Sequence, residues 1–331
     1  MPITIRELSR QCGLSVSTVS KALNGYPDIS EATRQRVVDA ARSLGYHPNA
    51  HARALKSGRS YNLGVLFSDE NNSGLTHAYF SAVLEAFKRE AEALGYDVTF
   101  ISHQLSGSSV TYLEHCHYRE VDGVCLACIN FQDPDVQELA ASDLPLVSID
   151  NAFPGRVCIE SDNAAGMRTL VEHVASKGHR NIAYIHGPAS GVTSIRVESF
   201  REAVRALGLP LREDWILESL YIDPGSLRAP MLSLLESDPR PSCILCPDDF
   251  SSIGAFNLCA QMNLRIPEDI AIAGFDGIPV VQLMRPRLTT VRQDADRIGG
   301  EAARALVRQI ESPGEARSSV IPCALIEGET V

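Results

Sequence analysis

The chain has 331 residues, of which 44% are hydrophobic, and its 41 acidic side chains outnumber the 30 basic ones to give a formal net charge of −11. It contains no run of 18 apolar residues, which excludes a membrane-spanning helix, and its start, MPITIREL, lacks the apolar segment of a secretory signal. We therefore expect a cytoplasmic protein of two or three compact units, in which the nine scattered cysteines stay reduced.

The charge is distributed unevenly along the chain. Residues 1–60 hold nine Lys and Arg against four Asp and Glu, a net charge of +5, whereas the remaining residues hold 21 against 37, a net charge of −16. Because an acidic body repels phosphates, contact with a nucleic acid is expected only at the basic N-terminal segment.

Residues 1–46 have the pattern of three short helices. IRELSRQC (5–12), VSTVSKAL (16–23) and EATRQRVVDAARSL (31–44) each follow a residue that caps helix N-termini and precede one that tolerates positive φ. The caps are Thr4, in a capping box with Glu7, then Ser15 and Ser30, and the stops are Gly13, Asn24-Gly25 and Gly45. Two helices around a tight turn, with a third supporting them, predict a helix-turn-helix domain.

Beyond Tyr61, short apolar runs alternate with amphipathic segments. The expected strands are NLGVLFSD, DVTFIS, DGVCLACI, PLVSID, NIAYIHG, SCILCPDD and IAIAGFD, and the expected helices are FSAVLEAFKREAEALG, AAGMRTLVEHVASKG, RVESFREAVRALG and FSSIGAFNLCAQMN. This alternation predicts an α/β protein with parallel, doubly wound sheets, and its restart near Asn181 indicates two similar lobes. A ligand is expected where the carboxyl ends of the strands face each other across the cleft.

Several segments in collinear order carry a family resemblance. The N-terminal block, HPNAHARALKSG, SKGHRNIAYIHGP, CPDDFSSIGA, IPEDIAIAGFD and PRLTTVRQD resemble the LacI/GalR family of bacterial transcriptional regulators. The resemblance implies a helix-turn-helix headpiece, a hinge helix and a two-lobed periplasmic-binding-protein-like core, with crossings between the lobes near Ser161, Val291 and Cys323. The implied domains are the headpiece 1–47, the hinge 48–60, an N-terminal core lobe 61–161 plus 292–322, and a C-terminal core lobe 162–291 plus 323–331.

In such a headpiece the second helix presents its first residues to base edges. Val16, Ser17 and Lys21 match the family's specificity residues: Val16 can pack on a thymine methyl group, Ser17 can serve several bases, and Lys21 can reach a guanine acceptor or a phosphate. Further DNA contacts are expected from Thr4, Ser15, Thr18, Ser20 and Asn24, and in the linker from Asn49, Ala52, Arg53, Leu55 and Lys56. The alternative is that small polar residues only cover a surface helix.

Polar side chains at strand ends match the family's ligand-contacting positions. These are Asp162, Arg196, Asp248 and Asp276, accompanied by the aromatic faces of Tyr79, Phe80 and Tyr221. Three carboxylates against one arginine favour a neutral polyol, so the expected effector is a sugar. The chain departs from the family's pattern at Asp248, where many relatives have Asn, and at Ala127, where some sugar-responsive members have a polar group. Asp276 and, more so, Asp249 could instead cap the loops that follow them, and a loop residue such as His77 is more often exposed than part of a pocket.

Two pairs, Cys125/Cys128 and Cys243/Cys246, have the spacing of zinc ligands. Both pairs fall inside expected strands, where residues three apart point to opposite faces, so we interpret them as buried cysteines. His115-Cys116-His117 falls on an expected helix, where adjacent side chains diverge. No nucleotide-binding or catalytic motif occurs, and we expect no metal, no cofactor and no enzyme activity.

The sequence thus predicts a homodimeric transcriptional regulator, most simply a repressor, that binds a pseudo-palindromic operator and responds to a sugar between its lobes. Two alternatives remain open. One is a regulator of the same family with a nucleobase or another small metabolite as corepressor. The other is a sugar-binding or sugar-processing module with an appended DNA-binding domain.

The resemblance also gives Leu55 a role, as an apolar wedge that enters a minor-groove step together with its symmetry mate. Leu55→Ala is therefore expected to lower operator affinity while effector binding stays intact. Gel-shift titration measures the first and thermal shift the second; unchanged operator affinity would contradict the role.

Overall fold

A computed structural model of the chain describes residues 3–46, 58–68, 74–105, 107–314 and 317–331. The chain divides into two compact units, Met1–Tyr61 and Asn62–Val331, each of which is described by itself. Within the described residues, no helix combines the length and the apolar character needed to cross a membrane. The five linker residues expected to contact DNA, namely Asn49, Ala52, Arg53, Leu55 and Lys56, lie outside the described residues.

The first unit contains the headpiece, which the structure describes over residues 3–46. Its helices are α1 (Ile5–Cys12), α2 (Val16–Leu23) and α3 (Glu31–Leu44), with the bounds that the sequence predicted. The expected caps are also confirmed. Thr4 forms the reciprocal capping box with Glu7, and the hydroxyl groups of Ser15 and Ser30 accept hydrogen bonds from backbone N–H groups of α2 and α3. The three helices bury a small shared core around side chains that are 0% exposed, Leu8, Val19 and Val37.

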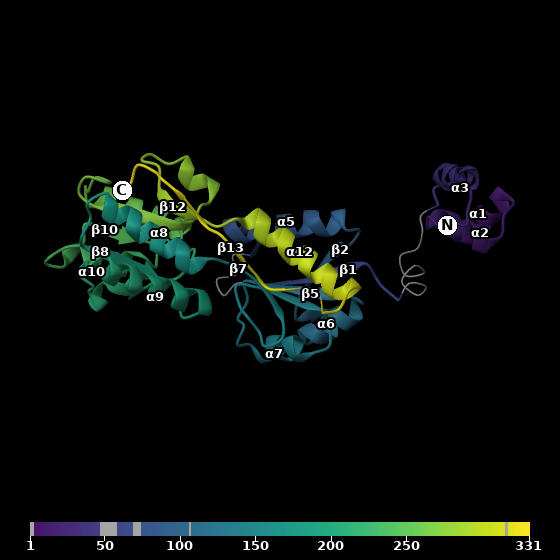
Figure 1. Cartoon of the computed structure of the whole chain (residues 1–331), viewed down its shortest axis with the longest axis horizontal. Helices are drawn as coiled ribbons and strands as arrows, with labels where there is room; N and C mark the ends of the chain where they lie inside the picture. Colours follow the sequence, from purple (N-terminus) through teal and green to yellow (C-terminus); the bar gives the residue numbers. More distant parts are fainter. Residues whose placement is uncertain (1–2, 47–57, 69–73, 106, 315–316) are drawn as a thin grey trace. The chain divides into compact units, whose positions relative to one another are not determined.

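The second unit contains two six-stranded sheets, and we call each sheet with its helices a lobe (Figure 1). The first sheet has the order β13-β7-β6-β5-β1-β2, with every neighbouring pair parallel. Its strands are β1 (Asn62–Phe67), β2 (Asp97–Ile101), β5 (Gly123–Ala127), β6 (Leu146–Ile149), β7 (Val157–Ser161) and β13 (Ser319–Ile321). The first lobe also has α5 (Ala78–Ala93), α6 (Tyr112–Tyr118), α7 (Pro134–Ala141), α12 (Ala295–Glu311), the 3-10 turn η1 (Gly74–Thr76) and the short pair β3 (Gln104–Leu105) and β4 (Ser108–Ser109).

The second sheet has the order β14-β12-β11-β10-β8-β9, parallel except for the antiparallel edge pair β12–β14. Its strands are β8 (Ile182–His186), β9 (Ile216–Glu218), β10 (Cys243–Leu245), β11 (Ala271–Asp276), β12 (Thr289–Arg292) and β14 (Ala324–Ile326). The second lobe also has α8 (Asn163–Ser176), α9 (Gly191–Ala206), α10 (Arg228–Glu236), α11 (Asp249–Gln261) and the 3-10 turns η2 (Glu213–Trp215) and η3 (Pro279–Gln282). The expected doubly wound α/β architecture is confirmed.

The chain passes between the two sheets three times. It leaves the first sheet at the end of β7, returns after β12 into α12, and crosses again between β13 and β14. Each lobe therefore contains segments from distant parts of the sequence, and Figure 1 shows α12 lying alongside α5 although more than half of the chain separates them.

Several elements differ from their sequence-based outlines, α9, β10 and α12 among them. Helix α9 begins at Gly191, five residues before the expected start, because Ser190 caps it through a hydrogen bond from the Thr193 N–H. Strand β10 is shorter than SCILCPDD because Asp248 already caps α11. Helix α12 was not among the expected elements.

The contact between α12 and α5 depends on Gly299. A Cβ atom added at Gly299 would lie 2.1 Å from the Val83 carbonyl oxygen and 2.7 Å from the Phe87 backbone nitrogen. At the adjacent Gly300 an added Cβ would meet only the guanidinium end of Arg304, at 3.2 Å. The two helix backbones can approach closely only because position 299 has no side chain.

We therefore expect opposite effects from two neighbouring substitutions. Gly299→Ala should lower the free energy of unfolding by about 1–3 kcal/mol, because the clash involves backbone atoms that cannot move aside. Gly300→Ala should be neutral or raise it by up to about 1 kcal/mol, since Ala is the better helix former and Arg304 can shift. Urea unfolding measures both, and equal losses in the two variants would contradict this account of the contact.

Candidate functional site

The headpiece presents the start of α2 to solvent. Val16 is 41% exposed and Ser17 is also exposed, and the Ser17 hydroxyl has no hydrogen-bond partner among the described residues. Lys21 lies one turn further along and forms an ion pair with Asp28, in the loop between α2 and α3. The roles of Val16, Ser17 and Lys21 on DNA stay predictions.

The other expected DNA contacts within the headpiece take part in helix caps. Thr4 belongs to the capping box of α1, and Ser15 caps α2, its hydroxyl oxygen lying 2.8 Å from that of Thr18. The Asn24 side chain donates to the Ser20 carbonyl oxygen at 2.6 Å, which closes the C-terminal end of α2. These residues therefore shape the helix ends, and their contacts with phosphates stay predictions as well.

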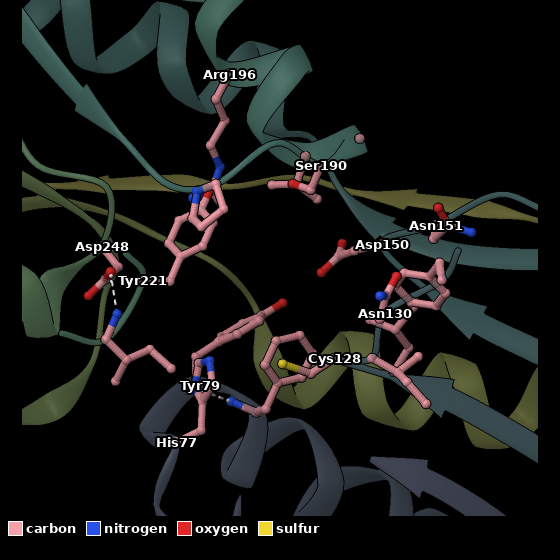
Figure 2. A pocket seen from close by; sticks show the side chains of 18 of the residues that line it. His77, Tyr79, Cys128, Asn130, Asp150, Asn151, Ser190, Arg196, Tyr221 and Asp248 are labelled. Carbon is pink, nitrogen blue, oxygen red and sulfur yellow. Dashed lines mark hydrogen bonds between the residues drawn. The ribbon is translucent and has the colours of Figure 1, made fainter. Parts of the chain in front are cut away.

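A cavity of about 310 Å³ lies between the two lobes, within the size range of small-molecule sites. Its lining comes from residues that follow strands or begin helices at the carboxyl edges of both sheets (Figure 2). From the first lobe these are 77, 79–80, 128–132 and 149–151, and from the second lobe 188–192, 196, 220–222, 248 and 276, with 293 following β12. Six of the seven expected effector contacts line it, namely Tyr79, Phe80, Arg196, Tyr221, Asp248 and Asp276.

Arg196 is held rigidly at the cavity. It comes from α9 and is 4% exposed. Its Nε donates to the Asn163 side-chain oxygen at 2.8 Å, one Nη donates to the Pro247 carbonyl oxygen at 3.4 Å, and its guanidinium stacks on the Phe275 ring at 3.7 Å. Among the described residues these two bonds use Nε and one Nη and neither acceptor is a carboxylate, so N–H groups of the guanidinium are left for a ligand.

Both carboxylate oxygens of Asp248 already accept hydrogen bonds within the protein, which limits how many a ligand can donate to them. One carboxylate oxygen accepts from the Ser251 N–H at 2.7 Å, and the other accepts from the Ser251 hydroxyl at 2.8 Å and the Ile222 N–H at 3.0 Å. Asp248 therefore caps α11 and fixes the segment that carries Tyr221. Gly187 makes room for the Tyr221 ring, because a Cβ there would lie 2.1 Å from it, and the Tyr221 hydroxyl lies 2.8 Å from the Thr193 hydroxyl.

Asp276 stands at the end of β11 with φ of 119°, a conformation that is unfavourable for any residue with a side chain. Gln293 donates to one of its carboxylate oxygens at 2.7 Å. A strained backbone that aims a carboxylate into a cavity is typical of functional sites.

Asp150 lines the same cavity, and the sequence analysis missed it. It follows β6 with φ of 61°, and one carboxylate oxygen accepts a long hydrogen bond, 3.4 Å, from the Ser161 N–H. Figure 2 shows its carboxylate directed into the space between the loops, from a different side than Arg196. The available signal was the one that identified Asp276, namely an acidic residue at the carboxyl end of an apolar strand.

Burial dominates the electrostatics of the cavity. It raises the pKa of Asp150 to about 6 and that of Asp276 to about 7, against the opposing effect of the Arg196 charge on both carboxyl groups. Burial also raises the pKa of Asp248, although its hydrogen bonds from Ile222 and Ser251 act in the opposite direction. Asp150 and Asp276, each with one hydrogen-bond donor, are therefore short of partners that would stabilise their charge.

Aromatic side chains supply the apolar part of the lining. Phe80 makes edge-to-face contacts at 4.9 Å with both His77 and Tyr79 at the start of α5. His77 is 8% exposed and caps α5 by accepting from the Phe80 N–H, so the expectation that it is simply exposed is wrong. Across the cavity, Tyr221 offers a further ring face.

Asp162 does not line the cavity, contrary to the expectation. Its carboxylate caps α8 by accepting from the Ala165 N–H at 2.9 Å. Asp249 is 0% exposed and accepts from the Thr290 hydroxyl and from the Ile278 N–H. It therefore fixes the distant loop after β11, and not a loop that follows Asp249 itself, where α11 begins. Neither Asp162 nor Asp249 is among the residues that line the cavity.

The cysteine pairs need one correction. Cys125 and Cys243 are buried within strands, but Cys128 and Cys246 lie just beyond β5 and β10, so the opposite-face argument does not apply to them. Cys128 has φ of 48° and lines the cavity. Within the described ranges, no three His, Cys, Asp or Glu side chains are grouped so that they could hold a metal ion.

Comparisons with known proteins agree with this architecture. Residues 4–49 match the family described as bacterial regulatory proteins, lacI family, and residues 171–331 match the periplasmic binding protein-like domain. Catabolite control protein A of Priestia megaterium is 30% identical over 316 residues, which cover 93% of this chain and 92% of that protein. The HTH-type transcriptional repressor PurR of Histophilus somni is 27% identical over 317 residues, 94% of this chain and 93% of that protein.

Two solved structures are similar over the full length. The Lac repressor dimer bound to operator and the anti-inducer ONPF has a TM-score of 0.83 at 25% identity, covering 100% of this chain and 99% of that one. The transcriptional regulator CelR–cellobiose complex has a TM-score of 0.73 at 26% identity, covering 99% of this chain and 100% of that one.

The raised pKa of Asp276 leads to a pH-dependent prediction. Burial raises the pKa of its carboxyl group to about 7, from an ordinary value of 3.8. Between these two pH values Asp276 is protonated in the folded protein but ionised in the unfolded chain. The free energy of unfolding therefore falls as pH rises from about 4 to about 7, and the full cost of the buried charge is present at pH 8.

Asp276→Asn removes this ionisation and keeps an oxygen that can accept from Gln293. We expect the variant to melt above the wild type by roughly 2–4 °C or more at pH 8, and by less at pH 5. Asn also tolerates positive φ better than Asp, but the rise in melting temperature from that cause is the same at every pH. The test is therefore whether the rise in melting temperature is larger at pH 8 than at pH 5. An equal rise in melting temperature at the two pH values would contradict the interpretation that the ionised Asp276 carboxylate destabilises the folded protein.

Proposed function

Because the chain belongs to the lacI family of bacterial regulatory proteins, we propose that it represses transcription from a pseudo-palindromic operator and that a small neutral sugar in the interlobe cavity controls this activity. The observation that carries the proposal is the composition of the cavity. It combines under-satisfied carboxylates, a fixed arginine and aromatic faces at the carboxyl edges of two sheets. Those groups match what a polyhydroxylated molecule offers.

A sugar can satisfy each part of the lining. Two of its hydroxyl groups would donate to Asp150 and Asp276, whose carboxylates have few donors of their own. The remaining N–H groups of Arg196 would donate to hydroxyl oxygens. The C–H face of the ring would pack on Tyr221 or Phe80, in the manner of apolar surface on an aromatic ring.

The charges favour a neutral ligand over an anionic one. Asp150, Asp248 and Asp276 line the cavity, whereas Arg196 is the one Lys or Arg side chain among its lining residues. A phosphorylated sugar would add negative charge beside carboxylates whose pKa burial already raises, so its binding would be opposed. The similar CelR structure contains cellobiose, which supports a neutral sugar as the ligand class.

The DNA-binding part of the proposal rests on the headpiece. We propose that Val16, Ser17 and Lys21 read base edges, while the caps of α1 and α2 and the linker 48–60 contact the backbone and the minor groove. Two headpieces, one per half-site, make a homodimer the natural form, and the Lac repressor structure similar to this chain is a dimer on its operator.

Control of the operator requires a ligand that binds the two conformations of the core with different affinity. We propose that a sugar held by Asp150 from the first lobe and by Arg196 and Asp276 from the second lobe changes the angle between the lobes 61–161 plus 292–322 and 162–291 plus 323–331. That change would separate the two hinge segments of the dimer and release the DNA. The relatives are regulators of transcription, and we propose no catalytic step.

The test begins with a thermal-shift panel at pH 8 of free sugars, the same sugars as phosphates, and nucleobases. A free sugar should raise the melting temperature, because a ligand that binds only the folded state stabilises it by mass action. Asp150→Asn and Asp276→Asn should each weaken its binding roughly ten- to hundredfold, since each loses a charge-assisted hydrogen bond. Asp162→Asn is the matched control and should keep the wild-type shift, because Asp162 does not line the cavity.

A second measurement gives the sign of the response. A duplex enriched from a random pool by the wild-type chain should contain a pseudo-palindrome, and the sugar should lower its affinity in a gel shift. A response only to nucleobases, with increased DNA affinity, would favour the corepressor alternative. Turnover of the sugar, or no enriched duplex, would contradict the proposal.

A further inference from the structure

The headpiece contains an ion pair at its expected reading surface. Lys21 on α2 donates from Nζ to a carboxylate oxygen of Asp28, which is seven residues later in the loop before α3. The side chains are 40% and 52% exposed, so both remain accessible to a ligand. The hydrogen bond between them raises the pKa of Lys21 and lowers that of Asp28, so both groups are charged at neutral pH.

The loop that carries Asp28 is anchored on both sides. Tyr26 N–H donates to the Lys21 carbonyl oxygen at 3.1 Å, and Ile29 N–H donates to the Tyr26 carbonyl oxygen at 3.2 Å. Arg34 from α3 donates to the Tyr26 carbonyl oxygen at 3.2 Å, and Ile29 packs against the headpiece core. The loop backbone therefore places the Asp28 carboxylate beside Lys21.

This pairing changes what Lys21 can do on DNA. A lysine ammonium is a compact point charge on a flexible stem, with three donors, and phosphates attract it wherever they occur. Asp28 cancels its charge and occupies one donor. An ammonium in this state attracts phosphates weakly, but it retains two directed N–H groups.

We propose that Asp28 is a specificity-determining residue of the headpiece, which restrains Lys21 from phosphates and reserves it for acceptors on a base edge. The proposal rests on the proposed function, in which α2 enters the major groove. A guanine presents the two acceptors O6 and N7 there, and the two free donors of the tethered ammonium suit such a pair. Random DNA offers mainly phosphate attraction, which the carboxylate offsets.

The test uses the full-length chain with Asp28→Asn. The probes are the duplex enriched from a random pool by the wild-type chain and a scrambled duplex of equal length and base composition. Affinity for the scrambled duplex at 0.1 M salt should rise roughly three- to eightfold per headpiece, with a salt slope steeper by about 0.9 per headpiece, because one cation is released to phosphates. Affinity for the enriched duplex should rise less, so the ratio of the two affinities should fall.

A matched control separates this effect from net charge. Asp39→Asn removes the same charge from an exposed position on α3, where the carboxylate accepts only from Gln35 among the described residues. It should leave the ratio of affinities at the wild-type value. An equal fall in the ratio for Asp39→Asn would overturn the proposal in favour of a general charge effect.

A double-mutant cycle provides the second discrimination. In a Lys21→Met background, Asp28→Asn should no longer change the ratio, because the lysine that it restrains is absent. A ratio that still falls in that background would overturn the proposal. Asp28→Ser repeats the measurement if the Asn variant melts below the wild type. Failure of the wild type to enrich any duplex would contradict the proposed function itself, whereas enrichment with an unchanged ratio in Asp28→Asn would contradict only the role of Asp28.

Discussion

Parallel strand pairing is the constraint on which the core of this protein depends. Neighbouring parallel strands end at the same edge of a sheet, so every connection that leaves them begins on that side. The segments after β5 and β6 in the first lobe and after β8, β10 and β11 in the second therefore bring their side chains to a common cavity. The carboxylates, the guanidinium and the ring faces that line it come from segments scattered over more than 200 residues, and the sheets alone bring them together.

The parts that could be predicted from the sequence are those determined by local interactions. The headpiece helices have their expected bounds because a cap such as Ser15 or Ser30 acts on a backbone N–H only three residues away. The α/β class was also predictable, since short apolar runs separated by amphipathic segments leave few other architectures. The positions of Arg196 and Tyr221 at the cavity came instead from the family resemblance.

The parts that could not be predicted depend on where a backbone points. Asp162 and Asp248 both precede a helix and both cap it, yet only Asp248 also lines the cavity, and nothing local in the sequence separates them. Asp150 acquires its direction from a positive φ that the sequence does not reveal. The pairing of Lys21 with Asp28 likewise depends on the path of a loop. Asp150 and Asp276 share a further property: their raised pKa values mean that burial opposes their charge, which hydrogen bonds from a ligand would stabilise.

Because the chain crosses between the lobes three times, the order of synthesis also determines when each part of the protein can fold on the ribosome. The headpiece completes its core within its own three helices, so it can fold as soon as it emerges. The first lobe begins next but cannot be finished, because α12 and β13 are among the last segments synthesised. Strands β8 to β12 of the second lobe are all present before α12 exists. At that point the second lobe lacks only β14 and the residues after it, whereas the first lobe lacks both α12 and β13. A nascent chain interrupted after Arg292 therefore carries a DNA-binding unit attached to a half-built sensor.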